Sequence, residues 1–389
     1  MKFKFSFLSF LSLALATVLS LGACSDSKDP NPNPGPDPTD YDFAPVISTY
    51  VDNVVMPTYA DMKNKAKVLL DKIAAFNDDP SNANLAAAGA AWLEVREPWE
   101  MSEAFLFGPC GDNGLNVDPM IDTWPFDMDQ FTNKINGEVA LTPAAVSAFD
   151  ESTRGYHTIE YLIFKEGHSK DITTDPLSAR EKEYLESAAT VLYYDCVRLW
   201  IAWNGLDGIS AADQAAVNGM KAIDYWDEVQ DYLDRNSGSF SVVFKEAKSP
   251  YMDISDIVEE MVRGISDIAV EVAENKIALP ASENDVTLVE SHYAYNSLVD
   301  FVDNIKSIEN AYYGTRTGSA SANCLSTFVK SQNPDLDDTI VAAIANAKAK
   351  INSITYPFAL NLNDTANIQA ATAACMDIDE AILEILKLL

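Results

Sequence analysis

The chain has 389 residues, of which 48% are hydrophobic, so it is long and apolar enough to form globular domains with ample core. It carries 59 acidic and 27 basic residues, a formal net charge of −32. This charge serves solubility. It also argues against nucleic acid and anionic membrane surfaces as partners, because both repel an acidic protein, and it favours cations or a cationic partner.

The first residues predict export. Lys2 and Lys4 precede an apolar run over residues 5–21, which is too short and too well terminated to span a membrane. We therefore expect residues 1–23 to be a signal peptide. The sequence Leu-Gly-Ala-Cys at residues 21–24 resembles a bacterial lipobox, which implies cleavage before Cys24 and lipidation of that cysteine. Plain secretion with a free Cys24 is the alternative.

Residues 24–42 are rich in Asp, Asn and Pro, a composition typical of an extended tether. Acidic residues directly after the lipidated cysteine resemble the surface-export tags of Bacteroidetes lipoproteins. The sequence thus predicts an outer-membrane lipoprotein whose partner is the membrane, reached through the lipid anchor. The globular part would face either the periplasm or the cell surface.

From residue 43 onward, apolar residues recur at helical spacing. In the first part of the chain, Pro57 is expected to kink a long helix or to start its main part. A helical run opening at the cap residue Thr142 has His157 and Glu160 among its inward positions. The helices expected here cover 46–76, 85–103, 142–164, 176–203 and 210–235, with a long irregular segment over 108–141.

After a break at residues 236–239, a short strand is expected over 240–244 and four more helices follow. They are predicted near 254–272, 282–308, 336–351 and 364–389. Each half then reads as two helices, an aromatic-glycine break and two helices. We expect an all-α fold of two four-helix-bundle-like domains, 43–236 and 237–389, related by duplication; the repeat rests on the order of elements.

An unusual polar set lies on the inward faces of the second and third helices. Buried charges are costly unless they are paired or bound, so this set predicts either a metal site or a buried ion network. Imidazole and carboxylates at three-residue spacing resemble metal sites in helical bundles. Gly155 reduces helix stability, which suggests close approach of a backbone or a ligand. The set comprises Arg96, Glu100, Glu103, His157 and Glu160.

Other reactive residues form no recognisable site. The common zinc peptidase motif needs two histidines one helical turn apart, and this pair is missing. His168 is expected in a solvated loop, and His292 on a helix near the domain boundary. Cys196 and Cys375 lie on apolar stripes and are expected to be buried. Two cysteines in polar loops could form a disulfide, which the sequence leaves open: Cys110 and Cys324.

The segment Gly155-Tyr156-His157-Thr158-Ile159-Glu160 resembles the GxHxxE motif of the imelysin-like proteins. Supporting segments are residues 92–109, 121–125 and 289–315, so the resemblance covers nearly the whole mature chain. It implies an all-helical fold of two related domains, and a bacterial envelope protein tied to iron or haem uptake. The family also carries a peptidase assignment in which the His/Glu motif binds metal.

Carried onto this chain, the resemblance implies a metal site with iron favoured and zinc possible. Its ligands would be His157, Glu160, Glu100, Glu103 and Asp122, while Arg96, Trp99 and Gly155 would contact a bound ligand. The first hypothesis is a lipoprotein that binds iron or an iron-bearing ligand and works with iron or haem uptake proteins. The alternatives are a metallopeptidase and a structural, partner-docking lipoprotein without metal.

Overall fold

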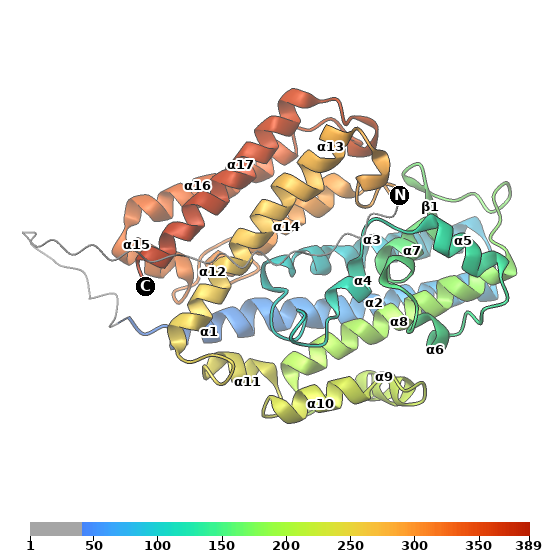
Figure 1. Ribbon diagram of the computed structural model, residues 1–389, viewed down its shortest axis with the longest axis horizontal. Helices are drawn as coiled ribbons and strands as arrows, with labels where there is room; N and C mark the ends of the chain where they lie inside the picture. Colours follow the sequence, from blue (N-terminus) through green and yellow to red (C-terminus); the bar gives the residue numbers. More distant parts are fainter. Residues whose placement is uncertain (1–40) are drawn as a thin grey trace, which may run out of the picture. The chain divides into compact units, whose positions relative to one another are not determined.

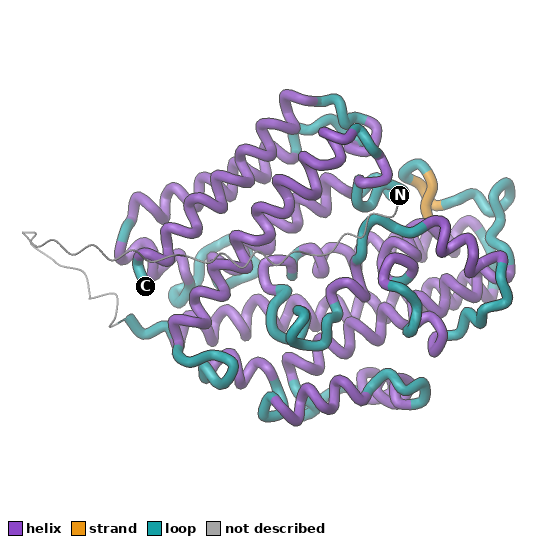
Figure 2. The backbone as a smooth tube through the Cα atoms, in the orientation of Figure 1, coloured by secondary structure: helices purple, strands orange, loops and turns teal. Residues whose placement is uncertain are grey.

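The computed structural model describes residues 41–389. Within this range the regular structure is helical, apart from one hairpin of two short strands in which Phe164–Lys165 (β1) pairs antiparallel with His168–Ser169 (β2) (Figure 2). The predicted all-α fold is therefore confirmed. The predicted signal peptide, the lipidated Cys24 and most of the tether lie outside the described residues. None of the helices in 41–389 has the length and apolar character that crossing a membrane requires.

The N-terminal bundle is built on three long helices that pack together. The first is continuous through α1 (Ala44–Tyr50), a π-helical turn η2 (Val51–Val55) and α2 (Met56–Asp78), with a proline at the start of α2 as the sequence predicts. The second is α3 (Asn82–Glu100), and the third is α8 (Ala179–Asn204). Side chains cap the N-termini of α3 and α8. Ser81 accepts a hydrogen bond from a backbone N–H of α3, and Ser178 forms a capping box with Glu181 at the start of α8.

The C-terminal bundle contains four main helices that pack against one another (Figure 1). They are α12 (Ile254–Glu271), α14 (Ser297–Tyr313), α16 (Pro334–Ile351) and α17 (Thr365–Leu383). Shorter elements connect them, and η8 (Glu384–Lys387) follows the last. The connecting elements are η5 (Val272–Ala278), α13 (Leu279–Glu283), η6 (Val286–Leu288), α15 (Leu325–Gln332) and η7 (Phe358–Leu360).

The helix predicted over 142–164 is wrong as a single element. The chain forms α6 (Pro143–Val146), a 3-10 turn η4 (Glu151–Thr153) and α7 (Gly155–Ile163). The break arises because Arg154 is extended and Gly155 has φ +71°, a conformation that interrupts a helix. The inward positions Thr153, His157 and Glu160 are nevertheless buried.

Three other boundaries differ from the prediction. The expected strand 240–244 is a helix, α11 (Phe240–Lys245), because Ser239 caps it and its apolar side chains cover one face. The region 210–235 forms two helices, α9 (Ala211–Lys221) and α10 (Asp227–Arg235). A helix does not begin near residue 282, because the left-handed Asn284 ends α13 and α14 starts at Ser297.

The long segment 108–141 is partly ordered as α4 (Asp118–Asp122) and α5 (Met128–Asn136). It approaches α7 so closely that the carbonyl oxygen of Ile121 lies 2.2 Å from where a Cβ on Gly155 would stand. The two bundles meet where α14 packs on α3 and where α12 packs on the 3-10 turn η3 (Glu103–Phe105). This junction brings α3, α4, α7 and α14 together at one place.

A glycine-to-alanine pair tests this close approach. We expect Gly155→Ala to destabilise the fold by about 1 to 3 kcal/mol more than Gly208→Ala, measured by urea unfolding. Gly208 has a similar φ of +72°, but no atom lies within 4 Å of the place that its Cβ would take, so it reports the backbone cost alone. Equal losses in the two variants would show that the Ile121 contact is unimportant.

Candidate functional site

His157 lies on α7 and is held by Glu160 one turn later. The ring Nδ1 is 2.8 Å from Oε2 of Glu160, and the other carboxylate oxygen, Oε1, accepts the backbone N–H groups of Tyr293 and Ala294 at 2.9 Å each. Both oxygens of Glu160 are therefore engaged. The arrangement places the ring proton on Nδ1, fixes the ring orientation and links α7 to the C-terminal half.

The other ring nitrogen of His157, Nε2, faces two further carboxylates. It is 3.1 Å from Oδ1 of Asp122 and 3.9 Å from Oε1 of Glu290. The Asp122 contact lies off the N–H direction, so Nε2 is a buried atom without a directed hydrogen bond. Ligand atoms of these three residues lie within 4.8 Å of one another, a spacing that fits one metal ion. The ring of Trp124 covers the imidazole at 4.6 Å.

The guanidinium of Arg96 is fully buried and stands beside this cluster. It is 2.8 Å from Glu290 and 3.5 Å from Asp300, and it contacts Glu100 and Asp122 more closely still. The indole N–H of Trp99 donates to Asp122. Arg96 and Trp99 therefore contact the carboxylates of the site, which fits their predicted location.

Lys276 supplies a second buried cation from the π-helical turn η5. Its Nζ is 3.1 Å from Oε1 of Glu103, 3.1 Å from Oε2 of Glu290 and 3.7 Å from Oε2 of Glu100. The amide of Asn304 also donates to Glu100 at 2.6 Å. These contacts form one connected network that draws on both halves of the chain.

The network has more negative than positive groups. Its permanent cations are Arg96 and Lys276, which contact five carboxylates: Glu100, Glu103, Asp122, Glu290 and Asp300. A sixth carboxylate, Glu160, contacts His157. Burial raises the pKa of Asp300 to about 7, and it also raises the pKa of Glu100 despite Arg96 and Lys276. Such a site favours either bound protons or an additional cation.

His157 and Asp122 shift in the opposite sense to what burial alone would give. Burial lowers the pKa of the His157 imidazolium, but its contacts with Asp122 and Glu160 outweigh this effect and raise the pKa to about 9. Burial likewise disfavours the Asp122 carboxylate, yet the charges of Arg96 and His157 hold its pKa below the ordinary value.

The structure brings most of the predicted site residues together. His157, Asp122 and the orienting Glu160 lie at its centre, and Glu100 and Glu103 lie on the Lys276 side. Gly155 lies against the Ile121 backbone, where it permits the close approach of the two segments, and it does not face the cluster. Sequence reasoning missed three members contributed by the second half of the chain: Lys276, Glu290 and Asp300. The sequence signals were charge at helical positions for Lys276 and Asp300 and, for Glu290, its place in the segment 289–315 that resembles the family.

The remaining histidines and the four cysteines in 41–389 are not members of this ion network. His168 is exposed on the hairpin, and His292 is half-buried against the ring of Trp124. The four cysteines in 41–389 are unpaired and buried, so the open question of a Cys110–Cys324 disulfide is answered by two free thiols.

Comparison with known proteins shows the family to which this chain belongs. The sequence profile described as Imelysin matches residues 55–385. The chain belongs to the imelysin family. A relative named iron-regulated protein A, from Synechococcus elongatus, is 28% identical over 316 residues, which cover 81% of this chain and 77% of the relative.

Two solved structures share the imelysin fold with this chain. One, described as a precursor of iron-regulated protein A from Parabacteroides distasonis, has a TM-score of 0.76 and 32% identity, covering 92% of this chain and 96% of that one. An imelysin-like protein from Psychrobacter arcticum has a TM-score of 0.61 and 18% identity, covering 88% and 94% of the two chains.

The raised pKa of His157 gives a pH prediction for the metal-free protein. Because the folded-state pKa lies near 9 and the ordinary value is 6.5, the charged ring stabilises the fold fully below about pH 6.5, and this contribution is lost as the pH rises through about 9. We expect the free energy of unfolding to fall by up to about 3 kcal/mol over that window. Urea unfolding between pH 6 and 10 measures this decrease in the free energy of unfolding.

The matched controls are His157→Gln and His168→Gln. The first should flatten the profile between pH 7 and 9, whereas the exposed His168→Gln should follow the wild-type profile. A His157→Gln profile parallel to wild type would mean that this ring does not carry the charge we assign to it.

Proposed function

We propose that this imelysin-family protein binds iron at the buried cluster of Asp122, His157 and Glu290, as an anchored component of an iron-uptake system. The observation that carries the proposal is the His157 ring. Its Nε2 is buried without a directed hydrogen bond and lies beside carboxylates from two other segments. Relatives named iron-regulated proteins support iron as the metal. Anchoring through Cys24 is part of the same proposal.

Three side chains would hold the ion, each from a different segment. His157 offers a neutral imidazole nitrogen, and Asp122 and Glu290 offer carboxylate oxygens, a donor set that suits iron and also zinc. We assign Glu160 a different role from the predicted ligand, because it contacts Nδ1, whereas the other ring nitrogen, Nε2, faces Asp122 and Glu290. It would fix the tautomer and direction of the His157 ring, as carboxylates behind metal-bound histidines commonly do.

Charge supports the same assignment. Arg96 and Lys276 neutralise only part of the six buried carboxylates, and a divalent or trivalent ion would supply the remaining positive charge. Bound iron would replace the protons that burial places on the network. Binding should therefore release protons and strengthen as the pH rises from 5 to 8.

Burial favours binding over peptide hydrolysis. The side chains of Asp122, His157 and Glu290 are 4%, 1% and 7% exposed. A polypeptide substrate would have to reach a metal at this depth, whereas a single ion would not require that space. We therefore place the metallopeptidase alternative second.

Metal titration tests the proposal. We expect the wild-type protein to bind one Fe²⁺ per chain under anaerobic conditions, with a rise in melting temperature that grows with free metal. His157→Ala should abolish both effects, while the exposed His168→Ala should retain them. Elemental analysis of native protein and a parallel Zn²⁺ titration identify the preferred metal.

Glu160→Gln distinguishes an orienting residue from a ligand. It should weaken binding by about 10- to 100-fold without abolishing it, because Gln can retain only part of the hydrogen bonding. Circular dichroism confirms that each variant folds. If metal leaves the melting temperature unchanged and His157→Ala binds like wild type, the cluster is a structural ion network and the proposal fails.

A further inference from the structure

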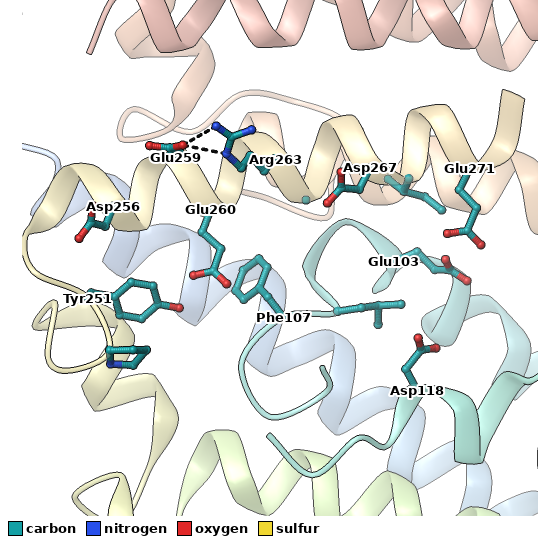
Figure 3. A pocket seen from close by; sticks show the side chains of 14 residues that line it. Glu103, Phe107, Asp118, Tyr251, Asp256, Glu259, Glu260, Arg263, Asp267 and Glu271 are labelled. Carbon is teal, nitrogen blue, oxygen red and sulfur yellow. Dashed lines mark hydrogen bonds and ion pairs between the residues drawn. The ribbon is translucent and has the colours of Figure 1, made fainter. Parts of the chain in front are cut away.

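A cavity of 670 Å³ lies between α12 and the segment that carries η3 and α4, and it shares Glu103 with the buried ion network (Figure 3). One wall is a continuous face of α12, and the rings of Phe107 and Tyr251 line part of the opposite side. The cavity wall holds seven carboxylates, from Glu103, Asp118, Asp256, Glu259, Glu260, Asp267 and Glu271.

Positive charge is scarce in this cavity. Its one lining cation among the described residues is Arg263, whose Nε donates to Glu259 at 2.8 Å, and both of these side chains are about half exposed. Figure 3 shows that pair together, while the side chains of Glu103, Asp118 and Glu271 point toward one another at the other end. Carboxylates held this close repel one another and attract cations.

The α12 face is held against η3 by a close contact. At Gly264, an added Cβ would lie 2.3 Å from the carbonyl oxygen of Ala104, so only glycine fits there without a shift. This approach brings the end of α12, with Asp267 and Glu271, beside Glu103 of η3. The acidic wall is therefore built by the packing of the two bundles.

Glu103 connects the cavity to the buried cluster. Its side chain is only 5% exposed, and its Oε1 accepts a hydrogen bond from Nζ of Lys276 at 3.1 Å. Lys276 is in turn 3.1 Å from Oε2 of Glu290, whose Oε1 is 3.9 Å from Nε2 of His157. A short chain of polar contacts thus runs from the cavity wall to the proposed iron ligands.

We propose that this cavity is the entrance through which hydrated metal cations reach the cluster at His157, with Glu103 as the carboxylate that passes them inward beside Lys276. The inference rests on the proposed iron binding. The carboxylates of α12 concentrate cations at the opening, and Glu103 offers the first buried carboxylate. Lys276 occupies the passage when no metal is present and yields its carboxylate contacts to the entering ion.

The test is the rate of metal uptake. Metal-free protein is mixed with anaerobic Fe²⁺ in a stopped-flow instrument, and binding is followed by intrinsic tryptophan fluorescence, to which Trp124 contributes with its ring 4.6 Å from that of His157. The double variant Asp267→Asn/Glu271→Gln should bind at least about tenfold more slowly at low ionic strength. High salt should reduce the difference, because it screens the cavity charge.

A matched control removes the same groups elsewhere. Asp377 and Glu380 lie exposed on α17 and do not line the cavity, so Asp377→Asn/Glu380→Gln changes the net charge equally. It should slow uptake by less than about twofold, and both double variants should still bind one metal ion. Glu271→Lys, which reverses one charge, should be slower than its neutral counterpart Glu271→Gln.

The outcomes separate the two proposals. Equal uptake rates in the cavity and control variants, with normal wild-type binding, would overturn the entrance alone. Absence of metal binding by the wild-type protein would overturn the iron site and the entrance together. Slow uptake confined to the cavity variants, with one ion still bound, is the result that the entrance requires.

Discussion

The ion pairs of Arg96 are the interaction on which the site depends. A fully buried guanidinium joins carboxylates from α3, α4, the segment before α14 and α14 itself. Arginine suits this place because its planar group offers several donors in fixed directions, which a lysine does not. Burying so many charges is costly, and loss of one partner from a buried pair commonly destabilises a protein by about 3 to 5 kcal/mol. The two bundles are therefore bound to each other by the groups that surround the proposed metal ligands.

The orientation of His157 depends on the same junction. Glu160 directs the ring from α7, but its second oxygen is fixed by the backbone N–H groups of Tyr293 and Ala294 in the other half. Glu290, which approaches Nε2, also comes from that half. Correct docking of the bundles is thus a condition for a complete site. A substitution far from His157 that loosens the contact of α3 with α14 would alter both ring orientation and ligand spacing.

Much of this organisation could be predicted from the sequence, and the remainder has physical reasons. The helical fold follows from apolar periodicity, and the inward positions of Glu100, His157 and Glu160 follow from spacing on α3 and α7. The break at Gly155 was not predictable from periodicity, because it depends on the Ile121 carbonyl of a distant segment. Helix α11 was mistaken for a strand because a five-residue apolar run fits either structure. Sequence reasoning missed three site residues, Lys276, Glu290 and Asp300, because their role depends on contact between the two halves of the chain. The domain boundary at residue 236 and the duplication stay predictions.

The two buried cations explain how so acidic a network can fold without a bound metal ion. Six carboxylates without compensation would oppose folding, so Arg96 and Lys276 supply enough positive charge to hold them, and raised pKa values at Asp300 and Glu100 allow protons to supply more. The imidazolium of His157 adds a further positive charge in the metal-free chain, and a bound cation would take the place of the protons. The two cations, Arg96 and Lys276, have different roles in the network. Arg96 contacts Asp122 and Glu290 and stays part of the framework, whereas Lys276 stands between Glu103 and Glu290 on a flexible stem. A movable ammonium can release its carboxylates to an incoming ion without disturbing the junction of the bundles. Under the proposed metal binding, the guanidinium of Arg96 would set a rigid frame, and the ammonium of Lys276 would be the charge that an incoming ion replaces.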